Sequence, residues 1–311
     1  MKTLATILVL SAALAAPAAA QATNSAYLDI TIVKVKPEKR ADFDALAKKI
    51  VDANRKNHGD AWLAYEAAYG ESDTVYFVST RADMGAIDSG MDAFMKSMKE
   101  SYGPGFESIF HELDNCVIGS RNELRRRRWD LSSMPGGDEA YVKYIGEARW
   151  IRTTAVRIRP GHMAEYEEVA EMLKEAAEKA DPSAVRLVSQ VVAGQTSGTY
   201  YLSTFQSSLG GFDGKMASAR ELLGDEAYAR YVKVVSESVI DSETMIGKLL
   251  PALSNPPEEI VDITRDFWMP KPDSVPATRQ KVLAENRDEE VVADNREDEA
   301  SPDEPDEDPP Q

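Results

Sequence analysis

The chain contains one internal repeat, and this repeat limits its architecture more than any other feature. The segment TIVKVKPEKRADF begins at Thr31, and TAVRIRPGHMAEY begins at Thr154. Four positions are identical in the two copies, and most of the others keep a basic, acidic or apolar side chain. The repeat therefore predicts that one folding unit is built twice along the chain.

Each copy opens with the pattern of a strand followed by a helix. Val33 and Val35 alternate with lysines, which is typical of a strand with one apolar face, and Pro37 stands where a helix would begin. Helical spacing then follows in the first copy at Phe43, Leu46, Ala47, Ile50 and Val51. The second copy shows the same spacing at Tyr166, Val169, Ala170 and Leu173.

Further segments complete each copy in the same order. Two strand-like runs come first, AWLAYEAAY and TVYFVST in the first copy and VRLVSQVVA and TYYLSTF in the second, separated by glycine-containing turns. A helical region that ends in FESIFHELDNCVIGS or YARYVKVVSESVIDS precedes a short strand at RRRRWDLS or KLLPALS. The predicted order is β-α-β-β-α-β, which is that of the ferredoxin-like unit.

The helices of such a unit cover one face of its sheet, so the other face needs a partner, and the second copy supplies it. On the element order, the repeat and the strand-to-helix junctions VKVKP and VRIRP, residues 26–256 resemble the dimeric α/β-barrel superfamily. The resemblance implies an α+β fold in which two ferredoxin-like repeats, 26–134 and 147–256, are fused into one intramolecular barrel. A C-terminal extension, 257–284, follows the second repeat.

Both ends of the chain differ from the repeats in composition. Residues 1–20 combine a lysine, an apolar run and small residues before Gln21, which predicts a cleavable signal peptide and a periplasmic or secreted protein. The run is shorter than the roughly 20 residues that cross a bilayer, so no membrane span is expected. Residues 285–311 hold thirteen Asp or Glu against two Arg, which predicts an acidic disordered tail and argues against nucleic acid as a partner.

The resemblance alone does not select an activity. The superfamily includes cofactor-free monooxygenases, haem-degrading enzymes, chlorite dismutases, peroxidases, isomerases and barrels without clear activity. Its haem enzymes need an axial histidine that faces a cavity, but His111 stands opposite Lys233 of the second copy, and His162 opposite Lys39. We therefore expect both histidines in solvent.

No other pattern in the chain predicts a catalytic or metal site. No His, Cys or carboxylate cluster has metal-ligand spacing, so neither a metal nor a cofactor is predicted. An Asn, Trp and His set like that of the cofactor-free monooxygenases does not map onto corresponding elements, and Trp62 is expected in the core. Cys116 is expected to be a buried, unreactive thiol.

The sharpest candidate site is the run of four arginines at 125–128, whose counterpart in the second copy is Gly247-Lys248-Leu249-Leu250. Alternate residues of a strand face opposite sides, so two of the four are expected to face the barrel interior or its rim. Because Arg126 and Arg128 share their parity with the apolar Leu124, we expect these two to face inward, although Leu131 and its counterpart Leu253 favour the opposite parity.

A buried guanidinium needs an anionic partner. Glu66 and Asp29, on neighbouring predicted strands, are candidates, and a ligand carboxylate or phosphate is another. The predicted ligand-binding residues are therefore Arg126, Arg128 and Glu66. The alternative is that the strand simply ends in solvent.

The sequence favours an exported, non-catalytic barrel that binds a small, partly apolar molecule between its sheets or serves in protein interaction. The alternative is a divergent cofactor-free monooxygenase or haem-binding enzyme of the same superfamily. The cluster Phe267-Trp268-Met269 either packs on the domain surface or covers a cavity mouth. Whether the chain catalyses a reaction, and whether it forms a homo-oligomer, is left open by the sequence.

Overall fold

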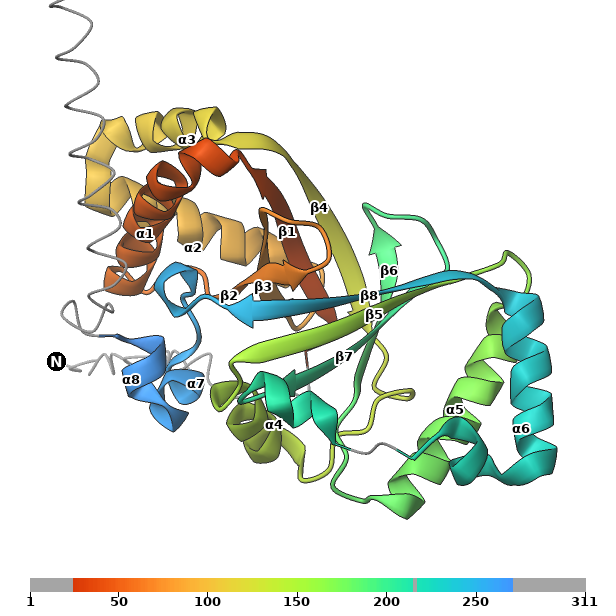
Figure 1. Cartoon of the computed structure of the whole chain (residues 1–311). Coiled ribbons are helices and arrows are strands. Elements are labelled where there is room, and N and C mark those ends of the chain that lie inside the picture. Colours follow the sequence, from red (N-terminus) through yellow and green to blue (C-terminus); the bar gives the residue numbers. More distant parts are fainter. Residues whose placement is uncertain (1–24, 215–216, 271–311) are drawn as a thin grey trace, which may run out of the picture. The chain divides into compact units, whose positions relative to one another are not determined.

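The computed structural model of the chain describes residues 25–214 and 217–270, and these residues form a closed antiparallel barrel (Figure 1). The strands follow the order β1-β3-β2-β8-β5-β7-β6-β4 around the barrel. The predicted signal peptide, the acidic tail and the end of the extension lie outside the described residues.

Each repeat supplies half of the barrel. The elements of the first repeat are β1 (Tyr27–Val35), α1 (Arg40–Lys56), β2 (Leu63–Tyr69), β3 (Thr74–Arg81), α2 (Gly85–Tyr102), α3 (Phe106–Asn115) and β4 (Val117–Arg127). Those of the second are β5 (Trp150–Ile158), α5 (Met163–Ala180), β6 (Leu187–Ala193), β7 (Thr199–Gln206), α6 (Ala219–Ser238) and β8 (Val239–Leu249). The predicted α+β fold of two fused ferredoxin-like repeats is confirmed.

The repeats join along two seams, where β2 pairs with β8 and β4 pairs with β6. At the second seam the chain turns after β6 at Gly194, which has φ +83°. A Cβ atom on this glycine would lie 1.9 Å from the carbonyl oxygen of Asn122. Only glycine therefore allows the chain to pass so close to β4.

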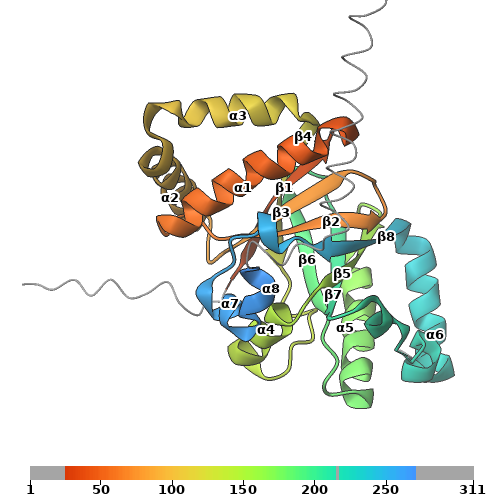
Figure 2. The same ribbon diagram turned by 60° about the vertical axis from the view of Figure 1, so that its left-hand side comes forward.

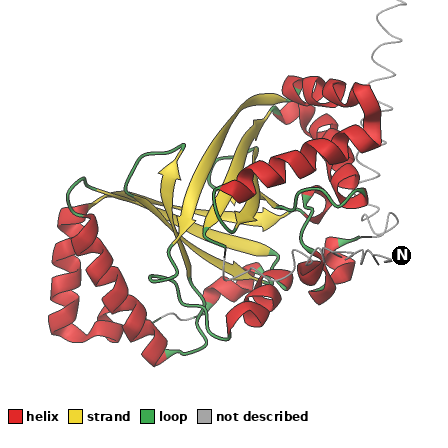
Figure 3. Ribbon diagram, turned by 180° about the vertical axis from the view of Figure 1, so that it is seen from behind, coloured by secondary structure: helices red, strands yellow, loops and turns green. Residues whose placement is uncertain are grey.

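The register of the strands separates an inner face from an outer one. On β1, Leu28, Ile30 and Ile32 lie inside the barrel, whereas Val33 and Val35 pack outward against α1. Helices α1, α2 and α3 cover the outer face of the first sheet, and α5 and α6 cover that of the second (Figures 1 and 3). Two helical layers thus enclose a barrel whose interior is built by both repeats.

One end of the barrel is covered by α4 (Gly137–Gly146), which links the repeats, together with α7 (Glu258–Ile263) and α8 (Arg265–Trp268) (Figure 2). The carbonyl oxygen of Gly146 accepts hydrogen bonds from Thr264 Oγ1 at 2.6 Å and from Trp268 Nε1 at 3.0 Å. Trp268 is fully buried, so this part of the extension covers the barrel rather than lying on an exposed surface.

The helix predicted over FESIFHELDNCVIGS is wrong at its end. Helix α3 ends at Asn115, and β4 runs from Val117 through the arginines as a long strand. Helix α6 likewise gives way to β8 at Val239. Within the described residues, no helix is both long and apolar enough to cross a membrane.

Candidate functional site

The first repeat holds a cavity of about 270 Å³ between its sheet and its helices, which we call the repeat-one cavity. Its wall is mostly aromatic and aliphatic and includes Phe43, Ala47, Trp62, Phe77, Phe94 and Phe110. Trp62 donates its Nε1 proton to the carbonyl oxygen of Leu253 at 2.8 Å, so this side chain presents only its ring to the cavity. The wall suits an apolar molecule.

One end of this cavity is polar. Arg81 donates to both oxygens of Asp60, at 2.6 and 2.7 Å, and to Asp29 at 3.2 Å. Burial alone would lower the pKa of Arg81, but these bonds outweigh it and raise that pKa. A Cβ atom on Gly90 of α2 would lie 2.4 Å from Arg81 Nη1, so the helix approaches the guanidinium closely only because glycine stands there.

The second repeat fills the corresponding space. Its cavity measures about 70 Å³ and is lined by Tyr166, Tyr200 and Tyr231. Tyr200 holds the position of Val75, because Tyr200 pairs with Val156 as Val75 pairs with Val33. Tyr200 lines the smaller cavity and packs against Tyr166 with 5.3 Å between ring centroids, whereas Val75 does not line the larger one.

The barrel interior contains a buried ion pair that the sequence reasoning missed. Arg125 donates to Glu123 Oε2 from Nε at 2.9 Å and from Nη2 at 2.6 Å, and its guanidinium lies 3.3 Å from the ring centroid of Tyr201. Burial raises the pKa of Tyr65 beside them well above its ordinary range. Glu123 and Arg125, two residues apart in one strand, share its inner face, and this spacing was the available signal.

The ion pair lies between two interior spaces. A chamber of about 310 Å³, the barrel chamber, extends toward α4 and α7, and an open mouth of about 340 Å³ lies at the other end. Tyr65, Arg125 and Thr153 line both spaces. Gly247 makes room for Tyr65, since a Cβ atom there would lie 2.7 Å from the Tyr65 ring.

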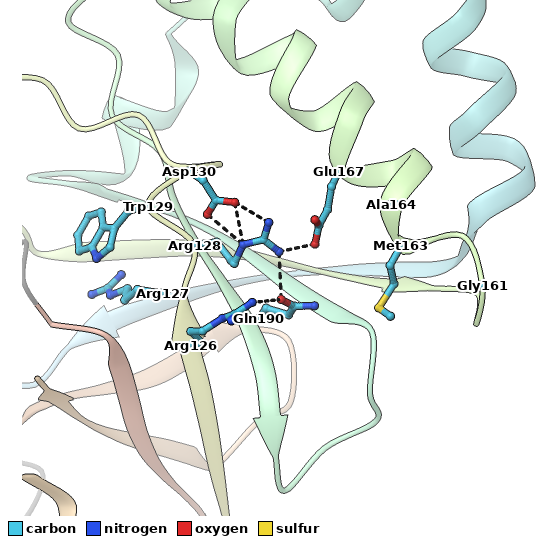
Figure 4. A pocket seen from close by; sticks show the side chains of 10 residues that line it. All are labelled: Arg126, Arg127, Arg128, Trp129, Asp130, Gly161, Met163, Ala164, Glu167 and Gln190. Carbon is cyan, nitrogen blue, oxygen red and sulfur yellow. Dashed lines mark hydrogen bonds and ion pairs between the residues drawn. The ribbon is translucent and has the colours of Figure 1, made fainter. Parts of the chain in front are cut away.

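Arg128 lies outside the barrel, in a groove beside α5 (Figure 4). It donates to Asp130 from Nε at 3.0 Å and from Nη2 at 2.6 Å, and also to Glu167 and Gln190. The hydrogen bonds with Asp130 and Glu167 raise the pKa of Arg128 and lower the pKa of both carboxyls. Arg128 is therefore already matched by carboxylates of the chain itself.

The other predicted ligand-binding residues lie apart from one another. Arg126 is exposed and reaches Gln190 Oε1 at 3.4 Å, and Glu66 pairs with Arg40 at 2.7 Å. The structure does not bring Glu66 to Arg126 or Arg128, and Asp29 pairs with Arg81 instead. Ligand binding by these residues stays a prediction.

The predicted inward face of the arginine strand is wrong. In β4, Arg125 pairs with Leu28 and Glu123 with Ile30, both of which face the barrel interior. The odd-numbered residues of this strand therefore point inward. Arg126, of the opposite parity, is exposed on the outside.

The histidines line none of these spaces. His58 and His111 are exposed, and His162 Nδ1 donates to Glu165 Oε2 at 2.8 Å at the start of α5. Cys116 is buried, as expected. The described residues contain no group of three or more His, Cys, Asp or Glu arranged to hold a metal ion.

No known family model matches the chain, and no curated protein matches it by sequence. Solved structures with similar folds include a monooxygenase-like protein from Lactobacillus acidophilus NCFM (8% identity, 72% of this chain, 94% of the other, TM-score 0.45). A haem-binding protein from Thermus thermophilus is 13% identical in sequence, and the match covers 74% of this chain and 93% of the other with a TM-score of 0.41. Chlorite dismutase from Candidatus Nitrospira defluvii, in complex with imidazole, is 9% identical in sequence. This match covers 77% of this chain and 95% of the other with a TM-score of 0.40.

Such distant likenesses say nothing of activity, and the architecture is established by the chain's own topology. Two β-α-β-β-α-β units, each with helices on one face, close their open faces on one another in a barrel. The chain has the fold of the dimeric α/β-barrel superfamily, with both ferredoxin-like repeats supplied by a single polypeptide.

Proposed function

We propose that this chain is an exported binding protein that holds a small, mainly apolar molecule in the repeat-one cavity. The observation that carries the proposal is the difference between the repeats. The two cavities share the equivalent positions 43/166, 47/170, 50/173 and 77/202, and they measure about 270 Å³ in the first repeat and about 70 Å³ in the second. Since the second repeat shows that the fold fills this space readily, the open cavity is a property of the first repeat alone.

The polar end of the cavity indicates what the ligand carries. Arg81 is matched by Asp60 and Asp29, so the three side chains together hold one negative charge. Asp29 keeps acceptor capacity, because it receives only one hydrogen bond from Arg81. A neutral donor such as a hydroxyl group fits this end better than a carboxylate, which the aspartates would repel.

The alternative function, a cofactor-free monooxygenase or haem-binding enzyme, finds less support in these residues. A haem of this superfamily needs an axial histidine, and none of the three histidines lines the cavity. The residues present therefore do not fit a histidine-ligated haem there. The Trp62 indole nitrogen, a potential donor to a substrate, is already bonded to Leu253.

The test uses 1-naphthol, an aromatic probe with one hydroxyl group, titrated into the full chain while tryptophan fluorescence is followed. Binding is expected in the wild type and is expected to weaken by about tenfold or more in Ala47→Leu, which fills the cavity. The matched control is Ala170→Leu, because Ala170 is the equivalent residue of the second repeat. Equal binding by both variants would refute the proposal.

A second measurement addresses the alternative. Haemin titration of the same protein should produce no Soret band typical of histidine-ligated haem, and oxygen consumption with quinol substrates should stay at the buffer rate. Either signal, lost in Ala47→Leu and kept in Ala170→Leu, would favour the enzyme instead.

A further inference from the structure

The barrel chamber is a partly open space inside the barrel, distinct from the repeat-one cavity. Apolar side chains form most of its wall, among them Leu28, Ile30, Val78, Ile151, Phe205, Leu249 and Ile260. Its volume of about 310 Å³ lies at the lower end of the range of small-molecule sites, roughly 300–1,000 Å³. A chamber of this size and lining accepts a compact apolar group.

One wall of the chamber carries two guanidinium groups. Arg125 and Arg127 stand two residues apart on β4 and line the chamber together. Glu123 neutralises Arg125 through two hydrogen bonds to the same carboxylate oxygen. Among the described residues, only the first of these arginines has an anionic partner, and Glu259 of α7, which also lines the chamber, forms no ion pair with Arg127 there.

The known partners of Arg127 are neutral. Its Nη2 donates to the hydroxyl of Tyr141 at 2.8 Å, and it lies over the rings of Trp129 and Tyr141. Its Nε is buried and makes no hydrogen bond within the described residues. A half-buried guanidinium with an unused donor, in the wall of a mainly apolar chamber, calls for an anion.

The second repeat shows that the fold does not require these charges. By strand register, Arg125 corresponds to Gly247 and Arg127 corresponds to Leu249. Leu249 is buried in the apolar core of the same barrel end. A leucine would therefore fit this environment, and the arginine at 127 is a departure that packing alone does not explain.

We propose that the barrel chamber binds a small monocarboxylate with an apolar body, and that Arg127 holds its carboxylate. Ser189, buried and directly opposite Arg127 on β6, supplies a hydroxyl donor beside the guanidinium. A single negative charge matches Arg127, which has no ion pair among the described residues, whereas a doubly charged phosphate would exceed it and be repelled by Glu259 in the chamber wall. The apolar body lies toward Ile151, Leu249 and Ile260.

The experiment measures binding of sodium octanoate to the full chain by isothermal titration calorimetry, with octanamide as a neutral probe of the same shape. Octanoate is expected to bind the wild type. Octanamide is expected to have a dissociation constant at least about tenfold higher. Arg127→Leu, which copies Leu249, should weaken octanoate binding by about tenfold or more. Arg127→Lys should weaken octanoate binding by an intermediate factor, because lysine keeps the positive charge but cannot donate the two parallel hydrogen bonds of a guanidinium.

Two control variants should bind octanoate within about twofold of the wild type. Arg126→Leu removes the neighbouring arginine that points outward, and Ala47→Leu fills the repeat-one cavity, so the second control separates this site from the proposed function. Arg127→Leu should keep or raise the Tm without octanoate, because it leaves no carboxylate unpaired.

Several outcomes would overturn the proposal: no octanoate binding to the wild type, equal binding of octanamide, or wild-type binding in Arg127→Leu. Octanoate binding that disappears in Ala47→Leu would place the probe in the other cavity and also overturn it. A lower Tm with unchanged octanoate binding would assign Arg127 a purely structural role beside Tyr141. If Arg127→Leu does not fold, Arg127→Lys and the octanamide comparison decide.

Discussion

Arg125 and Glu123 are joined inside the barrel by two hydrogen bonds to one carboxylate oxygen, and both side chains are almost fully buried. The other oxygen, Glu123 Oε1, lies 3.0 Å from Arg121 Nη2, but the angle does not permit a hydrogen bond. The buried carboxylate thus depends mainly on Arg125. This dependence makes the pair sensitive to removal of one partner alone.

Arg125→Leu should lower the free energy of unfolding by up to about 3–5 kcal/mol, because it leaves the buried Glu123 with only the half-exposed Arg121 at 3.0 Å and the Tyr201 hydroxyl at 3.3 Å as partners. The double variant Glu123→Met with Arg125→Leu should recover most of that loss, since both charges are then gone; methionine is the residue at the equivalent position 245. Urea denaturation of the two single variants and the double variant gives the coupling energy. Additive losses would show that the two side chains do not depend on each other.

Acid should destabilise the protein through Asp130 and Glu167. Their pKa values are lowered by hydrogen bonds from Arg128, so the stabilisation is present above the ordinary pKa of 4.5 for a glutamate and is lost as pH falls through the lower folded values. Arg128→Leu, which copies Leu250, should flatten this dependence of Tm on pH. Arg126→Leu serves as the control and should keep the wild-type profile.

The two arginines that the sequence assigns to a ligand site should also differ at neutral pH. Arg128 contacts two carboxylates and is buried, whereas Arg126 is exposed and makes a long hydrogen bond to Gln190 at 3.4 Å. Arg126→Leu should change the free energy of unfolding by less than about 0.5 kcal/mol. The double variant should be as unstable as Arg128→Leu alone, and thermal melting compares the three. A clear loss in Arg126→Leu would contradict this assignment.

Neither repeat is expected to fold as a monomer. Residues 21–140 alone would expose the inner face that includes Leu28, Ile30 and Ile32, and would leave the β2 and β4 edges unpaired. Light scattering of this fragment should show aggregates or a homodimer that restores the missing sheet. A monomer with a cooperative thermal transition would be the contrary result.

The cover of the barrel chamber should depend on Trp268. This side chain is fully buried and donates to the carbonyl oxygen of Gly146 at 3.0 Å. Trp268→Ala should cost about 3–5 kcal/mol as a large core truncation. Chemical denaturation measures the loss, and Phe267→Ala, at the partly buried neighbour, is the control that should cost less.

The repeat and its element order can be predicted from the sequence because both copies keep the same apolar spacing and the same proline junction. The end of α3 cannot be predicted from the sequence, because the apolar residues Ile109, Leu113 and Val117 keep a helical spacing beyond the residue where α3 ends. The prediction of which β4 side chains face the barrel interior fails for a related reason. The apolar character of Leu124 favours the inside, but Leu124 pairs with Asp29 on the outer face of β1.

The candidate cavities are harder to predict from the sequence than the order of the elements. Charged residues such as Glu123 and Arg125 in a strand ordinarily indicate solvent, and only the closure of the barrel reveals that they are buried together. The volumes of the two cavities, about 270 Å³ and about 70 Å³, depend on the tertiary packing of many side chains from separate elements. Periodicity shows which residues face inward, but not how much space they leave.

The covalent link between the repeats has a consequence for how such a chain changes over time. In a symmetric homodimer every substitution appears in both subunits, so a change that opens one pocket opens the other and doubles its cost in stability. In this fused chain the two equivalent positions hold different residues, a tyrosine at position 200 and a valine at position 75. Because the repeats are fused in one chain, one repeat can change at a pocket while the other keeps the packing that stabilises the barrel.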